Sequence, residues 1–597
     1  MQQAVTTQSA VSPPRSGGPR PARAWLLLLL PFVIAAGALG LRLQGIDWDG
    51  GNFYHPDERS IYLRVDCMYR TLTDAPGWEA CANRDFPLDQ PGFPSITTFF
   101  DKDASPLNPH WFPLGTIVIY LLVGVRFLLE AVMDQVRLQD LASAGRTIAA
   151  FVDAGSVLLL YFLGKRLFSR PVGLLASGLL ALAVINIQLT HFYRPESFVV
   201  LLALGAFWWM LNVLERGRLR DHLGLGLLIG TTFAFRGSSV PMLVPLAITY
   251  GVVAWRAWQP GGRVALLPVV RRAALAAGVA LAAFAVLQPY ALLDFYKYVG
   301  DLAWETSIAR VAGQVPYTVQ YVGTTRTGLY ELQQTAVWAL GLPLGVVAWA
   351  GLGLSVLRGV RRPRTAEWLL LSWVLVLVLV IVPFFEVKFL RYIAPALPVM
   401  VLLGSRWLIE AHSWARARSS VLTRAVLAGI AVVVLATGFY ALAFVNSYRL
   451  DHPGVQASAW MNANAQAGSV VLTDNHWDEG FGGLGGFSVS QLPMYEGDTL
   501  AKAQRVASDV AGADYIMAYS NRPWGSIARL PERYPYSAAY YRALFSGELG
   551  YELVQAFARY PTLLGVSFVH DPFTRAGLPE PAVLPGIEPS ALALDLG

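Results

Sequence analysis

The stretch AWLLLLLPFVIAAGALGL, residues 24–41, decides the class of fold, because its eighteen residues are apolar or small and carry no charge. A run of about 20 such residues spans the ~30 Å hydrocarbon core of a bilayer as a helix. It is too long for the apolar region of a cleaved signal peptide, and no clear small-residue cleavage site follows it. We therefore expect an uncleaved first membrane span.

The composition extends this expectation to most of the 597 residues. Hydrophobic residues make up 55% of the chain and charged residues 14%, against about 25% charged residues in soluble proteins. This composition excludes a disordered chain, a collagen-like fibre and a secreted disulfide scaffold. The net charge is +6, but the basic residues fall in short loops between apolar runs, as in membrane proteins. Nucleic-acid binding is therefore not expected.

The sequence predicts a polytopic α-helical membrane protein with a C-terminal α/β soluble domain. Residues 1–24 form a disordered cytoplasmic tail, 25–443 a transmembrane module and 444–597 an extracytoplasmic domain, which has few basic residues and many acids. Two large outer loops, 45–144 with juxtamembrane helices and 291–331, interrupt the module. About eleven transmembrane helices are expected, at 25–44, 145–164, 171–190, 197–214, 222–236, 238–258, 273–290, 332–356, 367–384, 390–410 and 424–443.

Charge decides the orientation. Five arginine-rich loops near residues 165–170, 216–220, 256–272, 358–364 and 416–424 should be cytoplasmic. The segment 45–111 carries 11 acidic and 5 basic residues and should lie outside. These two assignments, cytoplasmic basic loops and an external 45–111 segment, agree only if residues 112–133 do not cross the membrane. We therefore expect an amphipathic or re-entrant outer helix there. The protein is then a multi-pass plasma-membrane protein with its N-terminus in the cytoplasm.

The only two cysteines, Cys67 and Cys81, both fall in the first outer loop. An oxidising compartment would permit a bridge between them. Two unpaired thiols are the alternative, and the sequence alone does not choose between them.

Three outer segments carry the candidate chemistry. The first is Tyr54-His55-Pro56-Asp57-Glu58, where apolar spacing downstream indicates a helix with Pro56 at its first position. Asp57 and Glu58 then either complement the helix dipole or supply a general base and its companion. His55 is a candidate substrate contact beside them.

The other two outer segments add cations and one more acid. Arg194 and Glu196 fall in a very short turn at the bilayer boundary, where ionisable groups tend to be functional. Lys388 and Arg391 are three residues apart and so share a helical face; with Tyr392 they could bind a lipid-linked phosphate. Snorkelling and interfacial anchoring are the alternatives for these side chains.

Further candidates lie within the predicted spans and in the C-terminal domain. Arg146 is expected near the outer end of its span and Arg236 at the outer end of another, both as substrate contacts. An internal salt bridge is preferred for Asp153. The run Asp474-Asn475-His476-Trp477-Asp478-Glu479 offers metal-ligand residue types, but a loop at a strand end explains it better. No metal residues are assigned; the sequence names no certain cofactor, and a divalent cation stays open.

Several motifs in this order resemble the polyprenol-phosphate-dependent glycosyltransferases of the GT-C fold, of the protein O-mannosyltransferase and lipid A aminoarabinose transferase type (glycosyltransferase family 39). They are the Asp57-Glu58 pair, the segments 108–114 and 164–168, Gly145-Arg146, and Lys388-Phe389-Leu390-Arg391-Tyr392-Ile393-Ala394-Pro395. The resemblance covers roughly residues 25–410. It implies transfer of a hexose or pentose from a polyprenyl phosphate on the outer face of the membrane.

The resemblance also implies roles for single residues. The acid matching Asp57 takes the acceptor proton, Glu58 is its companion, and Glu196 matches a second acid. The family usually has Asp at that second place, preceded by a small apolar residue, and often Lys where Arg236 stands. A single displacement would invert the sugar's anomeric centre. The acceptor is protein, lipid or glycan, and a lipid or sugar transporter without transferase activity is the alternative function.

Overall fold

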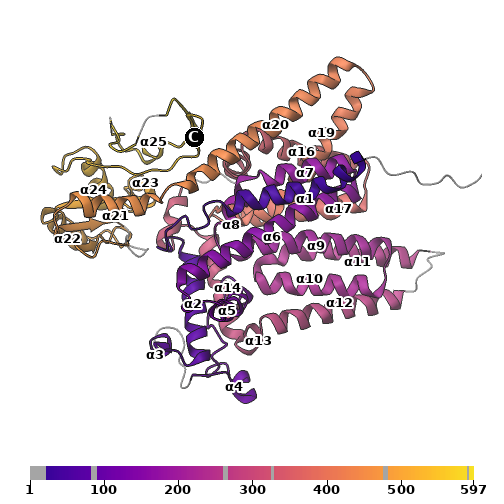
Figure 1. Cartoon of the computed structure of the whole chain (residues 1–597), viewed down its shortest axis with the longest axis horizontal. Coiled ribbons are helices and arrows are strands. Elements are labelled where there is room, and N and C mark those ends of the chain that lie inside the picture. The colour runs from indigo at the N-terminus through magenta and orange to yellow at the C-terminus, as the bar shows by residue number, and fades with distance from the viewer. Residues whose placement is uncertain are drawn as a thin grey trace, which may run out of the picture.

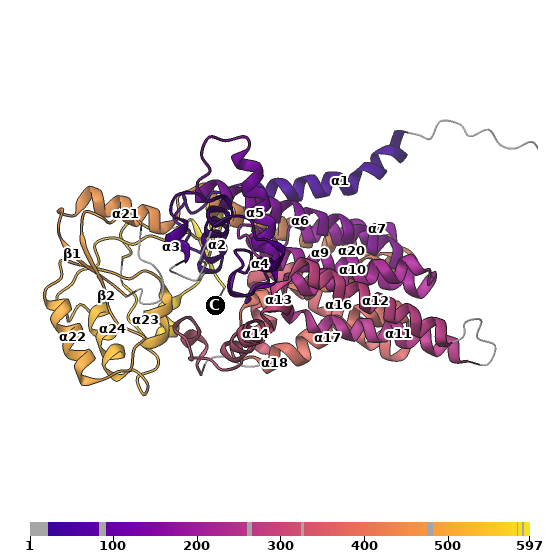
Figure 2. The ribbon, with the colours of Figure 1, turned by 90° about the horizontal axis from the view of Figure 1, so that it is seen from below.

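The computed structural model describes residues 22–82, 91–259, 266–323, 328–474, 482–581, 583–587 and 590–596. Long helices lie side by side in one bundle, and the C-terminal elements lie at one end of it (Figures 1 and 2). The bundle helices are α1 (Ala22–Leu43), α6 (Leu138–Leu167), α7 (Arg170–Ala181), α8 (Val184–Thr190), α9 (Pro195–Glu215), α10 (Leu219–Phe235), α11 (Leu243–Trp258), α12 (Leu266–Leu287), α16 (Leu342–Arg361), α17 (Thr365–Val376), α19 (Leu397–Arg416) and α20 (Ser420–Asn446).

The predicted membrane character is confirmed. Eight helices of the described chain are long and apolar enough to cross a membrane, or nine if α7 and α8, bent by 55° at their break, form one span. The other two predicted spans coincide with α1 and α10, which are shorter or less apolar. Only 17% of the apolar stretches of α12 and α20 is buried, so both helices expose apolar surface, as lipid-facing helices do.

The core of the bundle is aliphatic and tightly packed. Buried side chains of α6, α7, α9, α17 and α19 form its largest cluster, in which Trp373 is 2% exposed. A buried ion pair lies within it: Arg42 Nε is 2.5 Å from Asp153 Oδ2, and Arg42 also donates to the carbonyls of Ala181 and Leu180 at the end of α7. The predicted internal salt bridge of Asp153 is therefore present.

Shorter elements gather at the end of the bundle nearest the C-terminal elements (Figure 2). They are α2 (Pro56–Thr73), α3 (Trp78–Ala82), α4 (Ile96–Phe100), α5 (Ile117–Glu130), α13 (Tyr290–Leu293), α14 (Phe295–Arg310), the 3-10 turn η2 (Pro316–Tyr321) and α15 (Leu329–Gln334). Helix α5 has 14 residues, about 21 Å of helix, and packs its buried face against α2. It is too short to cross the bilayer, in agreement with the non-crossing helix predicted for 112–133.

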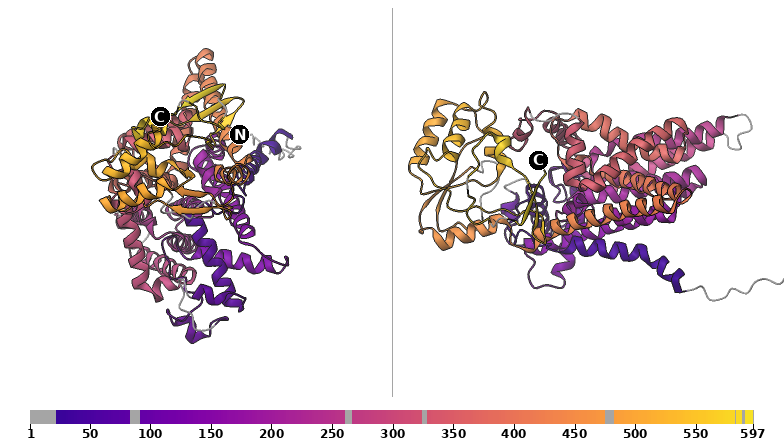
Figure 3. Two further views of the ribbon diagram at one scale, coloured as in Figure 1. Left: turned by 90° about the vertical axis from the view of Figure 1, so that its left-hand side faces the viewer. Right: turned by 90° about the horizontal axis from the view of Figure 1, so that it is seen from above.

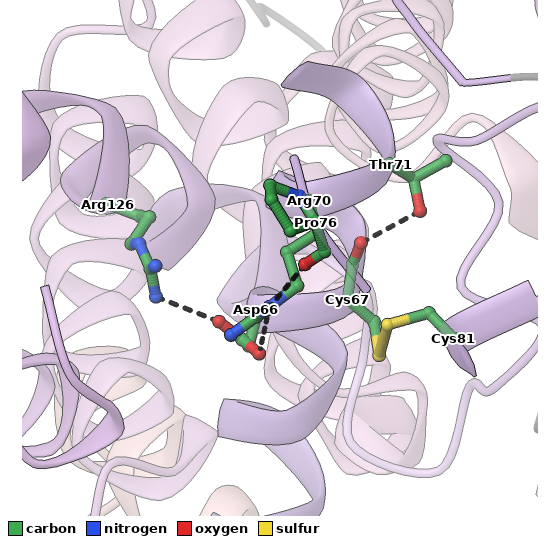
Figure 4. The surroundings of a disulfide bond; sticks show 7 residues. All are labelled: Asp66, Cys67, Arg70, Thr71, Pro76, Cys81 and Arg126. Carbon is green, nitrogen blue, oxygen red and sulfur yellow. Dashed lines mark hydrogen bonds and ion pairs between the residues drawn. A yellow bond between two sulfur atoms is a disulfide. The ribbon is translucent and has the colours of Figure 1, made fainter. Parts of the chain in front are cut away.

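A disulfide ties part of this end region together (Figure 4). Cys67 on α2 is bonded to Cys81 on α3; their Cα atoms are 5.4 Å apart, and the two residues are 14 positions apart in sequence. Next to it, Asp66 accepts from Arg70 at 2.8 Å and from Arg126 of α5 at 3.0 Å. The structure thus selects the bridge over two free thiols, and the bridge and ion pairs hold α2, α3 and α5 together.

The C-terminal region contains two small sheets and covering helices, as predicted for an α/β unit. Its elements are α21 (Pro453–Asn464), β1 (Val470–Thr473), β2 (Ser488–Gln491), α22 (Leu500–Ala511), β3 (Tyr515–Met517), α23 (Asn521–Ile527), α24 (Pro535–Phe545), β4 (Thr562–Leu563), β5 (Val566–Val569), α25 (Pro572–Ala576) and β6 (Leu592–Asp595). The first sheet is parallel in the order β2-β1-β3, and the second has the order β4-β5-β6. Figure 3 shows the C-terminal elements at one end of the bundle. The second sheet packs against the end of α20, where the ring centres of Phe568 in β5 and Tyr440 are 4.9 Å apart.

One expected strand is absent from this region. The apolar and aromatic residues of 551–557 predict a strand, but the structure assigns no strand there. The segment bonds to another loop instead, through Ala556 N–H and the Pro585 carbonyl at 2.7 Å. β-propensity without a partner strand does not make a ladder.

Contacts join the C-terminal region to the second outer loop. Arg529 donates to the carbonyls of Val322 and Gln320, each at 2.7 Å, and Arg533 donates to the Gly313 carbonyl at 2.8 Å. Val319 is buried in the core of the C-terminal region. These hydrogen bonds and the buried Val319 side chain hold the loop after α14 against the C-terminal region.

Candidate active site

The site is built on the first turn of α2. Pro56 occupies the first helical position, as predicted, and His55 caps the helix by accepting the Glu58 N–H at Nδ1 (3.4 Å). Consecutive helical residues point about 100° apart, so Asp57 and Glu58 face different surroundings. The Asp57 side chain is 32% exposed, whereas the Glu58 side chain is fully buried.

Glu58 belongs to a buried network centred on Arg146 of α6. Arg146 donates to Glu58 at 2.9 and 2.8 Å and to Asp49 at 3.2 and 2.8 Å. Its remaining bond goes to the Ile46 carbonyl at 2.9 Å. A guanidinium has five N–H donors, and all five are used inside the protein. The predicted phosphate contact of Arg146 is therefore corrected: this cation holds the first loop in place.

Arg194 and Glu196 meet Arg236 at the start of α9. Glu196 accepts from Arg194 Nη2 at 2.8 Å and Nε at 3.1 Å, and from Arg236 Nη1 at 2.7 Å. Arg194 and Glu196 are each 2% exposed, whereas the Arg236 side chain is 20% exposed. The structure brings these three predicted residues together, and of the three it is Arg236 that a ligand can reach.

Asp57 lies between two of the cations. Its Oδ2 is 2.5 Å from Arg194 Nη1 and 3.6 Å from Arg391 Nη1. Burial opposes ionisation of this carboxyl, but the charges of Arg194 and Arg391 outweigh it and hold the Asp57 pKa well below its usual range. Asp57 is consequently an anion at any physiological pH.

His55 is a neutral partner of this cluster. Burial and the charge of Arg194 lower the pKa of His55 to about 3, and its Nε2 lies 3.3 Å from Arg194 Nη1. A neutral imidazole accepts at only one of its two nitrogens. His55 therefore accepts either from the Glu58 N–H at Nδ1 or from Arg194 at Nε2, and in both tautomers it lies between the start of α2 and Arg194.

The residues of the third candidate segment, Lys388, Arg391 and Tyr392, lie in two different environments. Lys388 is buried, 3.0 Å from Glu331 Oε1 and donating to the Val382 carbonyl at 2.8 Å. Its predicted phosphate contact is corrected, because its ammonium group is buried and already paired with Glu331. Residues 388–389 are not helical, and only the short 3-10 turn η5 (Leu390–Tyr392) follows. Lys388 and Arg391 therefore do not share a helical face. Tyr392 lies beside Arg391, with the guanidinium 5.8 Å from the ring centre.

Arg391 itself is suited to bind an anion. Its side chain is 23% exposed, and it lies 4.3 Å from the centre of the Phe389 ring. Within the described part of the chain, its Nε is buried and has no hydrogen-bond partner. A buried donor without an acceptor costs free energy, which a phosphate oxygen would relieve.

Helix α14 contributes a residue that the sequence reasoning missed. Burial and the charge of Asp57 raise the pKa of the Glu305 carboxyl, and the charges of Arg236 and Arg391 lower it, although Glu305 lies more than 240 positions after Asp57 in the chain. No sequence signal marks it, because the segment WETSIAR (304–310) has no motif. Its proximity to the other residues comes only from how α14 packs.

The structure does not assemble a metal centre from the residues it describes. No group of three or more His, Cys, Asp or Glu side chains is arranged to hold an ion within those ranges. Residues 475–479 of the predicted 474–479 run lie outside the described residues. Asp474 is described: it is buried, bonded to Tyr541 and to the Tyr519 N–H, each at 3.1 Å.

Comparison with known proteins gives the context of this geometry. Residues 124–289 match the family described as dolichyl-phosphate-mannose-protein mannosyltransferase. An undecaprenyl phosphate-α-4-amino-4-deoxy-L-arabinose arabinosyl transferase of Pseudomonas aeruginosa is 30% identical over 276 residues, which are 43% of this chain and 45% of that protein. The match thus spans less than half the length of this curated relative.

Two solved structures are also similar. ArnT from Cupriavidus metallidurans in the apo state is 12% identical, with a TM-score of 0.47 over 88% of this chain and 91% of the other. The oligosaccharyltransferase AglB from Archaeoglobus fulgidus is 13% identical, with a TM-score of 0.49 over 88% and 72%. The matched family and the sequence relatives confirm the predicted resemblance to the polyprenol-phosphate-dependent glycosyltransferases, which residues 124–289 of this chain carry most directly.

Proposed function

We propose that this protein is a membrane glycosyltransferase that moves a sugar from a polyprenyl-phosphate donor to an acceptor hydroxyl. The observation that carries the proposal is the cluster of Arg194, Arg236 and Arg391 around Asp57 at one end of an apolar helix bundle. A lipid-linked phosphate needs cations at the end of an apolar bundle, where its isoprenoid chain can stay in lipid. The family match and the names of the sequence relatives support the same chemistry.

The arrangement suits a single displacement. The acceptor oxygen attacks the anomeric carbon as the carbon–oxygen bond to phosphate breaks, and the electron pair leaves with the phosphate. Arg391 and Arg236, the partly exposed cations, stabilise the departing anion. Asp57 takes the acceptor proton, and the configuration at the anomeric carbon inverts. A phosphate bound by Arg391 would weaken the 3.6 Å Arg391–Asp57 contact and so make Asp57 a stronger base.

The proposal is tested with the purified full chain in lipid nanodiscs. Undecaprenyl phosphate carrying 4-amino-4-deoxy-L-arabinose or mannose is the donor, and lipid A or a serine- and threonine-containing peptide is the acceptor. We expect release of undecaprenyl phosphate that depends on one acceptor, with a product of inverted anomeric configuration. Movement of the intact donor between leaflets, without release, would favour the transporter alternative.

Replacing Arg391 by Ala should weaken binding of undecaprenyl phosphate about 10- to 100-fold, because charge-assisted hydrogen bonds to the phosphate are lost. Equilibrium binding to the chain in nanodiscs measures this. Arg418→Ala is the matched control, since Arg418 is exposed in the loop between α19 and α20. Equal affinity in the Arg391 variant and the control would remove Arg391 from the phosphate site.

We further propose that the C-terminal domain, 444–597, lies outside the cytoplasm, and the N-terminus inside. The start of α1 and the C-terminal sheets lie at opposite ends of the bundle (Figure 2), and basic loops gather at the end away from the sheets. A Leu500→Cys variant should react with a membrane-impermeant maleimide in intact cells, because Leu500 is 61% exposed. Arg418→Cys should react only after permeabilisation; the reverse pattern would refute the orientation.

A further inference from the structure

Helix α14 is held against the site at two places. A Cβ atom at Gly237, next to Arg236, would lie 2.8 Å from the Tyr298 hydroxyl and 2.8 Å from a Leu302 methyl, so α14 approaches closely there. Later in the helix, the Ala309 carbonyl accepts from the Val387 N–H at 3.0 Å, in the segment that leads to Arg391. The helix therefore runs from the neighbourhood of Arg236 to that of Arg391.

Glu305 lies between these two contacts on the same helical face. Positions three and four apart on a helix share a face, so Tyr298, Leu302, Glu305 and Ala309 form one stripe. Loss of water around Glu305 and the negative charge of Asp57 raise the pKa of the Glu305 carboxyl. Within the described residues, Glu305 forms no ion pair or side-chain hydrogen bond. The packing removes only part of the water around Glu305, whose side chain stays open to solvent, unlike Glu58 and Glu196, whose oxygens are used inside the protein.

A carboxylate in this position has a restricted choice of ligand. It repels a phosphate, so it does not contribute to holding the donor's anionic part, which Arg236 and Arg391 attract. Its oxygens accept hydrogen bonds. A ligand that donates a hydrogen bond to Glu305 would offset the repulsion between the Glu305 and Asp57 carboxylates. The parts of the substrates that can donate are hydroxyl or amino groups of the sugar and of the acceptor.

We propose that Glu305 is a specificity-determining residue of the site, where it accepts a hydrogen bond from a hydroxyl or amino group of the transferred sugar or of the acceptor. This assignment rests on the proposed transferase function. Glu305 then binds the uncharged or cationic part of a substrate, Arg236 and Arg391 bind the phosphate, and Asp57 lies between the two.

Three measurements on Glu305→Ala and Glu305→Gln test the proposal, in the nanodisc assay with the donors and acceptors named above. Affinity for undecaprenyl phosphate alone should stay the same or increase, since a negative charge is removed near Arg391. The KM for either the sugar donor or the acceptor should rise about 10- to 100-fold in Glu305→Ala, the range for a hydrogen bond to a charged group. Glu305→Gln, which keeps one acceptor oxygen, should show a smaller rise.

The substrate whose KM changes identifies the source of the hydrogen bond. A change for the donor assigns Glu305 to the sugar, and a change for the acceptor assigns it to the acceptor. Glu532→Gln, an exposed carboxylate of the C-terminal region, is the matched control and should behave as the parent. Unchanged KM values in Glu305→Ala would overturn the proposal, and so would loss of undecaprenyl phosphate binding, which indicates a structural role. Failure of the parent to release undecaprenyl phosphate would instead overturn the transferase function.

Discussion

Replacing Asp57 by Asn should lower turnover by ~10²–10⁴-fold, the usual contribution of a general base. The amide keeps the size of the side chain and the start of α2, but it cannot take the acceptor proton. Steady-state release of undecaprenyl phosphate with saturating donor and acceptor measures the loss.

A binding measurement separates loss of the base from misfolding. Arg194 and Arg391 lose an anionic partner in Asp57→Asn, so affinity for undecaprenyl phosphate should be retained or increased. Asp103→Asn, an exposed carboxylate of the same outer loop, is the control and should transfer normally. If Asp57 only complements the helix dipole, the variant loses at most about 1 kcal/mol of stability and transfers at the parental rate. That result would exclude Asp57 as the base.

The sequence predicts the scaffold of the site better than the contacts within it. Apolar runs and basic loops locate the membrane helices because lipid requires long apolar helices whatever their partners. Pro56 at the first helical position follows from a similar local rule. Which of two neighbouring acids is buried is decided by tertiary packing, so Asp57 and Glu58 look equivalent in sequence and differ in the structure.

The errors at the site share a physical cause. Lys388 and Arg391 have helical spacing, but the chain between them forms a short 3-10 turn instead of a helix. Lys388 is also paired with the buried Glu331, away from Arg391. Basic residues near a predicted membrane boundary pair with acids from distant segments, and the composition does not show which acid each of them contacts. Glu305 is the opposite case: it has no motif of its own and reaches the site because Gly237 permits a close approach of α14.

Replacing Arg146 should destabilise the fold rather than weaken phosphate binding. Arg146, Asp49 and Glu58 are fully buried, and removing one partner of such an ion pair costs about 3–5 kcal/mol, because the other charge stays buried and unpaired. We expect Arg146→Met to lower the unfolding temperature in detergent markedly, or to prevent isolation of folded protein.

Neutralising the whole network tests the cause. The triple variant Arg146→Met, Asp49→Asn, Glu58→Gln leaves no charge in this network, and replacing a whole buried ion pair by well-packed uncharged residues of similar volume is milder than losing one partner. It should recover much of the stability that Arg146→Met loses. Arg146→Lys should lie between the two, since an ammonium lacks the planar fork that serves two carboxylates. If Arg146→Lys has the unfolding temperature of the parent but no longer binds undecaprenyl phosphate, Arg146 contacts the phosphate after all.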